Sequence, residues 1–180
     1  MAATRLAAVA LFLASTPALA QHQHPQAHAT PYAGFEKRDI KTLSEQQIAD
    51  LRAGRGMGLA LAAELNGYPG PVHVLELADR LGLDDPQRMR IRELTDAMKA
   101  ETIPLGGRLI DQEIELDGLF ATRQATPFNL TAATDAIGRT HGLLRAAHLK
   151  YHLTTAALLT AEQIRQYNQL RGYGASGHAD

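Results

Sequence analysis

The stretch "DPQRMRIRELTDAMKAETIPLGGRLIDQEIELDGLF", residues 85–120, decides the fold class. Its apolar residues recur every three or four positions, which is the period of an amphipathic helix. Pro104 falls inside the pattern, and we expect a bend there because the period continues on both sides. The stretch therefore predicts one long helix from Asp85 to about Gln124, whose apolar stripe consists of Ile91, Leu94, Met98, Leu105, Leu109, Leu116 and Phe120.

A second long helix is predicted directly after this one. The segment "ATPFNL", residues 125–130, predicts a turn, and a helical period follows from about Thr131 to Ala157. Two long helices joined by a short loop pack antiparallel. The rest of the chain has few β-branched runs and no strand-like alternation, so we predict an all-α domain. Its centre is a long antiparallel hairpin, with additional helices on the N- and C-terminal sides.

Three predicted helix starts share one sequence pattern: "LSEQQI" from Leu43, "LDDPQR" from Leu83 and "LTAEQI" from Leu159. In each, a good N-cap residue follows the leucine, and a glutamine three places later can accept from the backbone N–H of the cap. This arrangement is a capping box, which explains the motif structurally before any function is considered. The caps are Ser44, Asp84 and Thr160, and the glutamines are Gln47, Gln87 and Gln163.

The N-terminal helices are predicted to be interrupted. A helix that begins at Ser44 should break at "AGRGMG", residues 53–58, since each glycine weakens a helix by roughly 1 kcal/mol relative to alanine. "NGYPGP", residues 66–71, predicts a turn before a short helix from about Val72 to Leu81, and a last helix is expected from Thr160 to Arg171. The glycines follow no strand, so they do not predict a phosphate-binding loop.

The first twenty residues, "MAATRLAAVALFLASTPALA", have the pattern of a secretory signal, with cleavage expected near Ala20. We therefore expect an exported protein with no membrane span after cleavage, and export without cysteine or tryptophan suggests the bacterial envelope. The predicted organisation is a signal peptide over 1–20, a flexible tail with histidines and prolines over 21–41, a helical domain over 42–171 and a flexible tail over 172–180.

Composition narrows the function classes. Loss of Arg5 with the signal changes the 18 basic and 19 acidic residues to 17 and 19, a balance that does not suggest a nucleic-acid partner. Cysteine is absent, so the chain offers neither a disulfide nor a thiolate. No nucleotide-binding or hydrolase motif is present. We therefore predict that the protein is not an enzyme and requires no cofactor.

Histidines on the second long helix are the candidate metal ligands. At 100° per residue, His141, His148 and His152 look toward one side, and an i,i+4 imidazole pair can chelate a divalent metal. Antiparallel counting places Glu113 opposite His141, and Glu101 lies near the His148–His152 pair. The alternative interpretation is that these histidines are half-buried interface residues. The absence of the glutamate of a HExxH sequence favours that alternative over a hydrolytic metal site.

Taken in order, the motifs resemble the periplasmic CpxP/Spy proteins and their ZraP-like and CnrX-like relatives. The match to the Leu-Thr-x-x-Gln motif is Leu159-Thr160-Ala161-Glu162-Gln163, the near match is Leu43-Ser44-Glu45-Gln46-Gln47, and residues 83–87 are a looser one. The likeness extends from about Leu43 to Tyr173.

The resemblance implies a curved helical cradle that is often a homodimer. In one branch the cradle holds unfolded or misfolded envelope proteins without ATP, or regulates an envelope stress response. In the other, histidines, a glutamate and sometimes a methionine bind zinc, nickel, cobalt or copper, and a membrane-bound signalling regulator is the partner. This chain lacks a strongly basic balance, and its His148–His152 spacing only resembles the ligand pairs of the second branch.

Overall fold

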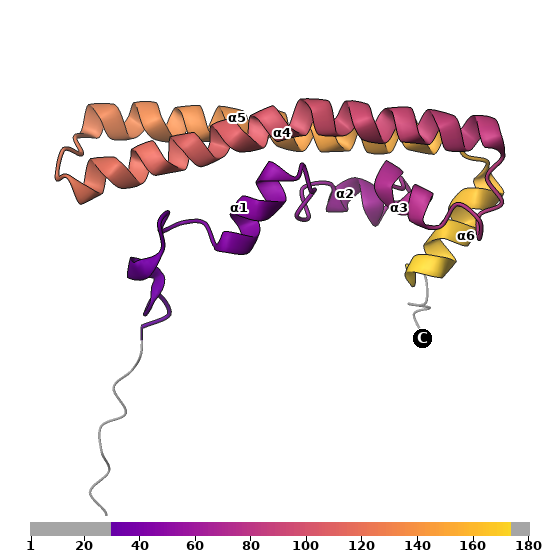
Figure 1. Cartoon of the computed structure of the whole chain (residues 1–180), viewed down its shortest axis with the longest axis horizontal. Coiled ribbons are helices and arrows are strands. Elements are labelled where there is room, and N and C mark those ends of the chain that lie inside the picture. The colour runs from indigo at the N-terminus through magenta and orange to yellow at the C-terminus, as the bar shows by residue number, and fades with distance from the viewer. Residues whose placement is uncertain (1–29, 174–180) are drawn as a thin grey trace, which may run out of the picture. The chain divides into compact units, whose positions relative to one another are not determined.

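The computed structural model describes residues 30–173, and over this range the protein is built from helices alone (Figure 1). The all-α prediction is confirmed. A short 3-10 helix, η1, precedes six α-helices. Their bounds are η1 Phe35–Lys37, α1 Glu45–Arg52, α2 Leu61–Glu64, α3 Pro71–Glu76, α4 Asp85–Ala121, α5 Pro127–Ala157 and α6 Ala161–Arg171.

The long helices α4 and α5 pack together as a pair, and α1 and α3 pack against α4 on one side of this pair (Figure 1). As predicted, α4 continues through Pro104 without ending. The turn predicted for residues 125–130 is shorter than expected, because α5 begins at Pro127. Thr126 caps this helix by accepting from Asn129 N at 3.3 Å, and the Asn129 side chain accepts from Thr126 N at 2.7 Å. This fourth capping box has asparagine where the other three have glutamine.

The three predicted capping boxes are all present. Ser44 accepts from Gln47 N at 3.2 Å, and Thr160 accepts from Gln163 N at 3.1 Å. Asp84 accepts from Gln87 N at 2.8 Å, with Pro86 in the first turn, where its missing N–H removes no helical bond. Local sequence therefore sets where α1, α4 and α6 begin.

The predicted interruption between the first helices is also present. Between α1 and α2, Gly54 has φ 65° and Gly58 φ 81°, left-handed conformations that glycine adopts without strain. Met57, between them, has φ 43°, which is uncommon for a residue with a side chain. After α2 the chain turns at Gly67, with φ 83°, and α3 ends at Glu76, earlier than the predicted Leu81.

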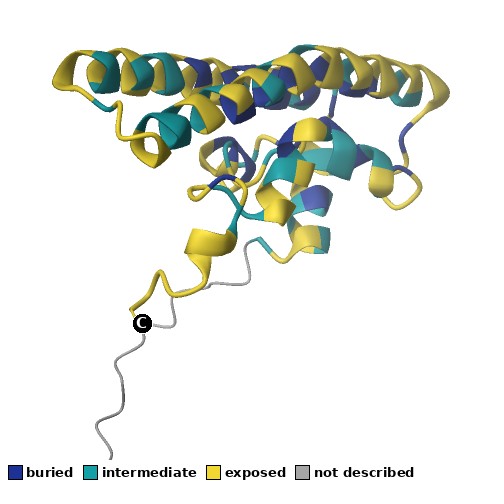
Figure 2. Cartoon of the chain, turned by 60° about the vertical axis from the view of Figure 1, so that its left-hand side comes forward, coloured by how far each residue is buried: buried dark blue, intermediate teal, exposed yellow. Residues whose placement is uncertain are grey.

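Two apolar clusters hold the short helices against the long pair. In the first, Leu51 of α1 packs with Leu109, Ile110 and Leu144. In the second, Val74 of α3 and Tyr167 of α6 pack with Ile91, near the start of α4. Figure 2 shows burial concentrated where the short helices meet the hairpin. Phe120, predicted on the buried stripe of α4, is instead 58 % exposed.

The helical domain begins earlier than predicted. Ile40, assigned from sequence to the flexible tail over 21–41, is 4 % exposed and belongs to the cluster around Leu51. At the other end, Gly172 caps α6 with φ 75°, and Tyr173 packs against the cluster around Tyr167. The predicted signal over 1–20, residues 21–29 and the tail beyond 173 lie outside the described residues. Within residues 30–173 no helix is both long and apolar enough to cross a membrane.

Candidate functional site

His148 and His152 lie on the face of α5 that meets the loops between α1 and α3, and both are buried. His152 Nδ1 is 2.7 Å from the backbone carbonyl oxygen of Tyr68. Because a carbonyl oxygen only accepts hydrogen bonds, Nδ1 carries the proton, and in the neutral ring Nε2 keeps a free lone pair. Gly70 lies against this ring, since a Cβ at residue 70 would be 2.8 Å from His152 Nε2.

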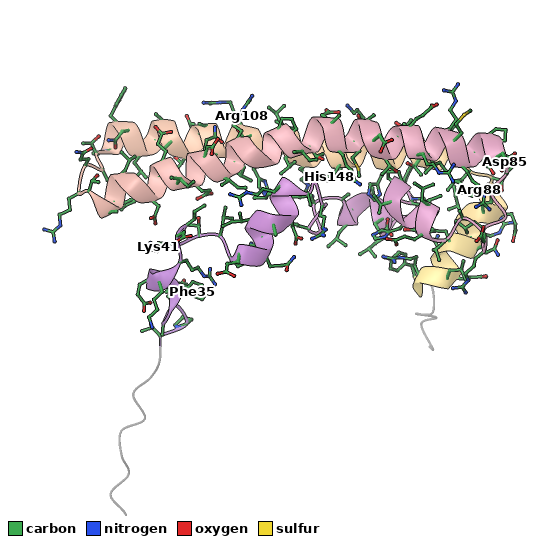
Figure 3. The ribbon with its side chains drawn as sticks, in the orientation of Figure 1. Phe35, Lys41, Asp85, Arg88, Arg108 and His148 are labelled. Carbon is green, nitrogen blue, oxygen red and sulfur yellow. The ribbon has the colours of Figure 1, made fainter. Side chains whose placement is uncertain are left out.

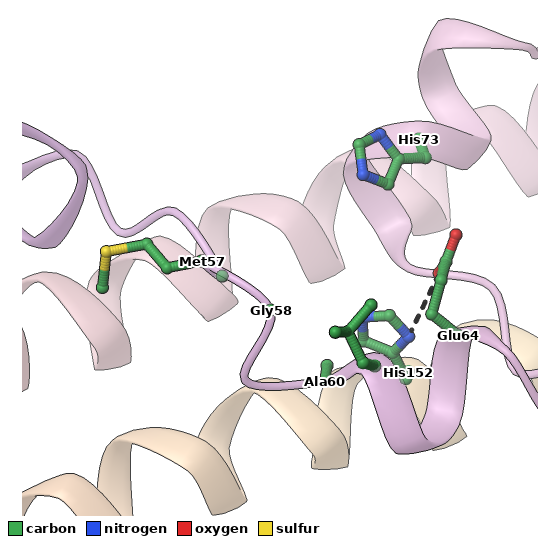
Figure 4. A pocket seen from close by; sticks show the side chains of 8 residues that line it. Met57, Gly58, Ala60, Glu64, His73 and His152 are labelled. Carbon is green, nitrogen blue, oxygen red and sulfur yellow. Dashed lines mark ion pairs between the residues drawn. The ribbon is translucent and has the colours of Figure 1, made fainter. Parts of the chain in front are cut away.

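Glu64 is the acidic residue of this site, and the sequence analysis did not select it. Its carboxylate is buried, accepts from Tyr167 OH at 2.5 Å and from Gly70 N at 3.2 Å, and lies 3.6 Å from His152 Nδ1 (Figure 4). Arg171 Nε lies 3.8 Å from Oε1 of the same carboxylate. The sequence does contain an indication of Glu64. It lies in the apolar run "LALAAEL", residues 59–65, where burial of an unpaired carboxylate would be costly in free energy.

The imidazole of His148 is a buried polar group whose hydrogen-bonding capacity is not fully used. It is 2 % exposed, and its Nε2 has no hydrogen-bond partner among the described residues. Burial lowers the pKa of His148 below its ordinary value, and the neighbouring His152 lowers it further. The ring is therefore neutral near pH 7. Figure 3 shows His148 on the hairpin face toward the short helices.

Two small cavities adjoin the imidazoles. One, of about 140 Å³, is lined by His148, His152, His73 and Met98 among others. The other, of about 160 Å³, has Met57, Glu64, His73 and His152 in its wall (Figure 4). His73 is partly engaged, since its Nδ1 lies 2.9 Å from Glu76 Oε2. The cavities are large enough for water or an ion but not for a drug-sized ligand.

The five candidate ligands predicted from sequence are not brought together. His141 is exposed. Glu113 accepts from Thr42 Oγ1 at 2.8 Å. Glu101 accepts from Lys150 Nζ at 2.5 Å and from Tyr151 OH at 3.0 Å, and the bond from Lys150 holds the pKa of Glu101 below its ordinary value. Only His148 and His152 remain adjacent.

Within residues 30–173, no three His, Asp or Glu side chains form a group that could hold a metal ion. Gly106 of α4 makes room for α1 and not for the imidazoles, because a Cβ there would overlap the carbonyl oxygen of Leu51. Metal binding by His148 and His152 remains a prediction that rests on the imidazole pair alone.

The half of the hairpin nearest its loop is a second candidate surface, because it exposes large apolar side chains. Ile114 is 51 %, Phe120 58 % and Phe128 86 % exposed. Phe120 and Phe128 lie on opposite sides of the α4–α5 loop, where Figure 2 shows mostly exposed chain. Exposed apolar side chains mark a surface that contacts other molecules where they form one continuous patch.

Comparison with known proteins adds no identification: no protein-family model, no curated protein and no solved structure matches the chain.

Proposed function

We propose that this protein is a Spy/CpxP-like periplasmic stress protein that holds unfolded envelope proteins without ATP. The observation that carries the proposal is the exposure of Ile114, Phe120 and Phe128 on the loop half of the α4–α5 hairpin. Unfolded chains expose apolar side chains, and burying these against the hairpin removes apolar area from water at about 25 cal/mol per Å². Such binding requires no nucleotide.

The charges around this surface support reversible binding. The α4 stretch "RLIDQEIELDGLF", residues 108–120, alternates carboxylates with apolar side chains, so apolar contacts are interleaved with hydrated groups. A mixed surface of this kind can hold a chain without burying it in a closed cavity, and its weak individual contacts allow release. The Leu-Thr-x-x-Gln motif and the export signal, both read from sequence, agree with this assignment.

The test is light scattering by a chemically denatured client that is diluted into buffer without nucleotide. We expect an excess of the protein to slow aggregation, and the Phe120→Ser/Phe128→Ser variant to lose most of the effect. Met89→Ser is the matched control, because Met89 is 54 % exposed near the start of α4. Equal aggregation with and without the natural protein would refute the proposal.

A second candidate function is binding of zinc, nickel, cobalt or copper in the periplasm, with a membrane-bound regulator as partner. The observation that favours it is the unpartnered, buried Nε2 of His148 beside His152, whose Nδ1–H is fixed by Tyr68 O. Imidazole ligands of metals are commonly oriented by such a bond from the other ring nitrogen. Two imidazoles leave the remaining coordination positions to water or to Met98, which lines the same cavity.

Calorimetric titration with each metal tests this candidate. The natural chain is compared with His148→Ala/His152→Ala, and all other histidines are common to both proteins. Binding that is lost in the variant would assign the two imidazoles as ligands. Identical heats for the two proteins would remove this candidate.

A further inference from the structure

A groove between α1 and α4 lies beside the exposed apolar half of the hairpin. It has a volume of about 550 Å³. Ile110 and Ile114 of α4 form one wall, and Ile48 of α1 lies in the other. Ile110 is buried, whereas Ile114 is half-exposed. The groove therefore offers an apolar floor that opens to solvent.

The groove is held open by contacts between its two walls. Thr42 Oγ1 donates to Glu113 at 2.8 Å, and Lys41 Nζ lies 3.5 Å from Asp117, so the segment before α1 is fixed to α4. Ile40, on the same segment, is anchored in the cluster around Leu51. The segment is therefore tied to α4 before a ligand binds, and such preorganisation reduces the entropy lost on binding.

The rim of the groove has a defined charge pattern. Asp39, Glu45 and Arg52 line it, and Arg52 follows Glu45 by seven residues along α1. All three side chains are exposed, and none has an ion-pair partner among residues 30–173. Asp39 and Glu45 also border an adjoining hollow of about 260 Å³, which Lys37 and Arg38 line as well. The two unpaired carboxylates thus lie where the two hollows meet.

We propose that the α1–α4 groove is the subsite where the protein grips an apolar segment of an unfolded chain that carries a lysine or arginine. Apolar side chains of the segment cover Ile48, Ile110 and Ile114, and its cation lies between Asp39 and Glu45. The proposal rests on the proposed holding function and specifies which segments are preferred. A carboxylate at the position of this cation is disfavoured, because it would face Asp39 and Glu45.

The test uses two fluorescent peptides of equal length and equal apolar content, which differ only in one central residue, lysine or glutamate. Fluorescence anisotropy at low ionic strength measures their binding to the purified protein. We expect the lysine peptide to bind roughly fivefold to tenfold more tightly, because surface ion pairs are strongest at low salt. Asp39→Asn/Glu45→Gln should abolish this preference with little change in side-chain volume.

Ile114→Ser should weaken the binding of both peptides by about tenfold or more, since it removes apolar area from the floor without adding a charge. Met89→Ser is the matched control, with similar exposure outside the groove, and should leave binding within about twofold of the natural protein. A photoreactive side chain on the lysine peptide provides a measurement that needs no variant. It should cross-link to residues of the 39–52 segment or to α4 near Ile114.

The outcomes separate this inference from the proposed function. If the natural protein suppresses aggregation but binds neither peptide, or binds them without sensitivity to Ile114→Ser and Asp39→Asn/Glu45→Gln, the groove is not the subsite and the holding function stands. Cross-links confined to other helices would also overturn the inference. A protein that neither suppresses aggregation nor binds peptide would overturn both.

Discussion

The side-chain amides of Gln87 and Gln163 hydrogen-bond to each other in both directions, with each Nε2 3.0 Å from the other's Oε1. Each Oε1 also accepts from the N–H of its own cap residue, Asp84 at 3.2 Å and Thr160 at 2.9 Å. The starts of α4 and α6 are therefore one hydrogen-bonded unit. Gln87 extends it by donating to the carbonyl oxygen of Leu158 at 2.9 Å.

This pairing predicts energetic coupling between the two glutamines. Gln87→Ala and Gln163→Ala should each lower the free energy of unfolding by roughly 1–2 kcal/mol, because each change removes a cap contact and leaves a partner amide unpaired. The double variant should lose less stability than the sum of the two single losses, and the difference, the coupling free energy, should be about 0.5–1.5 kcal/mol. Chemical denaturation of the four proteins measures this cycle. Gln47→Ala is the control, since the only hydrogen bonds of Gln47 beyond the helix within residues 30–173 are those of its own capping box with Ser44. Strict additivity would contradict the coupling.

The two adjacent glycines of α4 should respond oppositely to alanine. Gly106→Ala places a Cβ against the carbonyl oxygen of Leu51 and should displace α1. We therefore expect the free energy of unfolding to fall by roughly 1–3 kcal/mol. Gly107 has open space at the Cβ position, and Gly107→Ala should stabilise the helix by about 0.5–1 kcal/mol. Thermal unfolding of both variants checks the contrast. A stabilising Gly106→Ala would show that α1 does not approach α4 so closely.

Two buried tyrosines donate to glutamates in different surroundings, and removal of their hydroxyls should reveal the difference. Tyr167 OH donates to Glu64, whose side chain is 7 % exposed, whereas Tyr151 OH donates to Glu101, whose side chain is 38 % exposed. Tyr167→Phe should lower the free energy of unfolding by about 1–3 kcal/mol, because no water replaces the lost donor at Glu64. Tyr151→Phe should cost less, since solvent reaches Glu101. Equal losses in urea titrations would contradict this burial argument.

The helix starts could be predicted from sequence because a capping box is local. Ser44 and Gln47, or Thr160 and Gln163, are three residues apart, and their contact requires no knowledge of the fold. Thr126 with Asn129 uses the same chemistry, but the proline and asparagine in "ATPFNL" were interpreted as a turn. The pairing between Gln87 and Gln163 could not be predicted, since it depends on how α6 packs beside the start of α4.

The candidate site was predicted only in part for the same reason. The His148–His152 pair follows from helical spacing, but the partners of His152 come from residues 64 and 68, far away in sequence. Periodicity placed His141 on the same side as His148. It could not show that the short helices would cover His148 and leave His141 exposed.

Burial of the neutral His148 ring predicts that stability falls on mild acidification. The folded pKa of His148 lies below its ordinary value of 6.5, so the unfolded state binds more protons and the free energy of unfolding rises with pH. The stabilisation of the neutral ring is complete above about pH 6.5 and is lost as the pH falls below that value, at a rate of at most about 1.4 kcal/mol per pH unit. Urea titrations at pH 7.5 and pH 5.5, about one unit to either side of this ordinary value, measure the loss.

The variant His148→Gln should reduce this pH dependence, because glutamine keeps a polar side chain that does not titrate. His141→Gln is the control. His141 is an exposed histidine on the same helix, and its replacement should leave the slope of stability against pH unchanged. If the natural protein and His148→Gln lose equal stability between the two pH values, protonation of His148 is not the cause. A natural protein that gains stability on acidification would contradict the neutral, buried state of this ring.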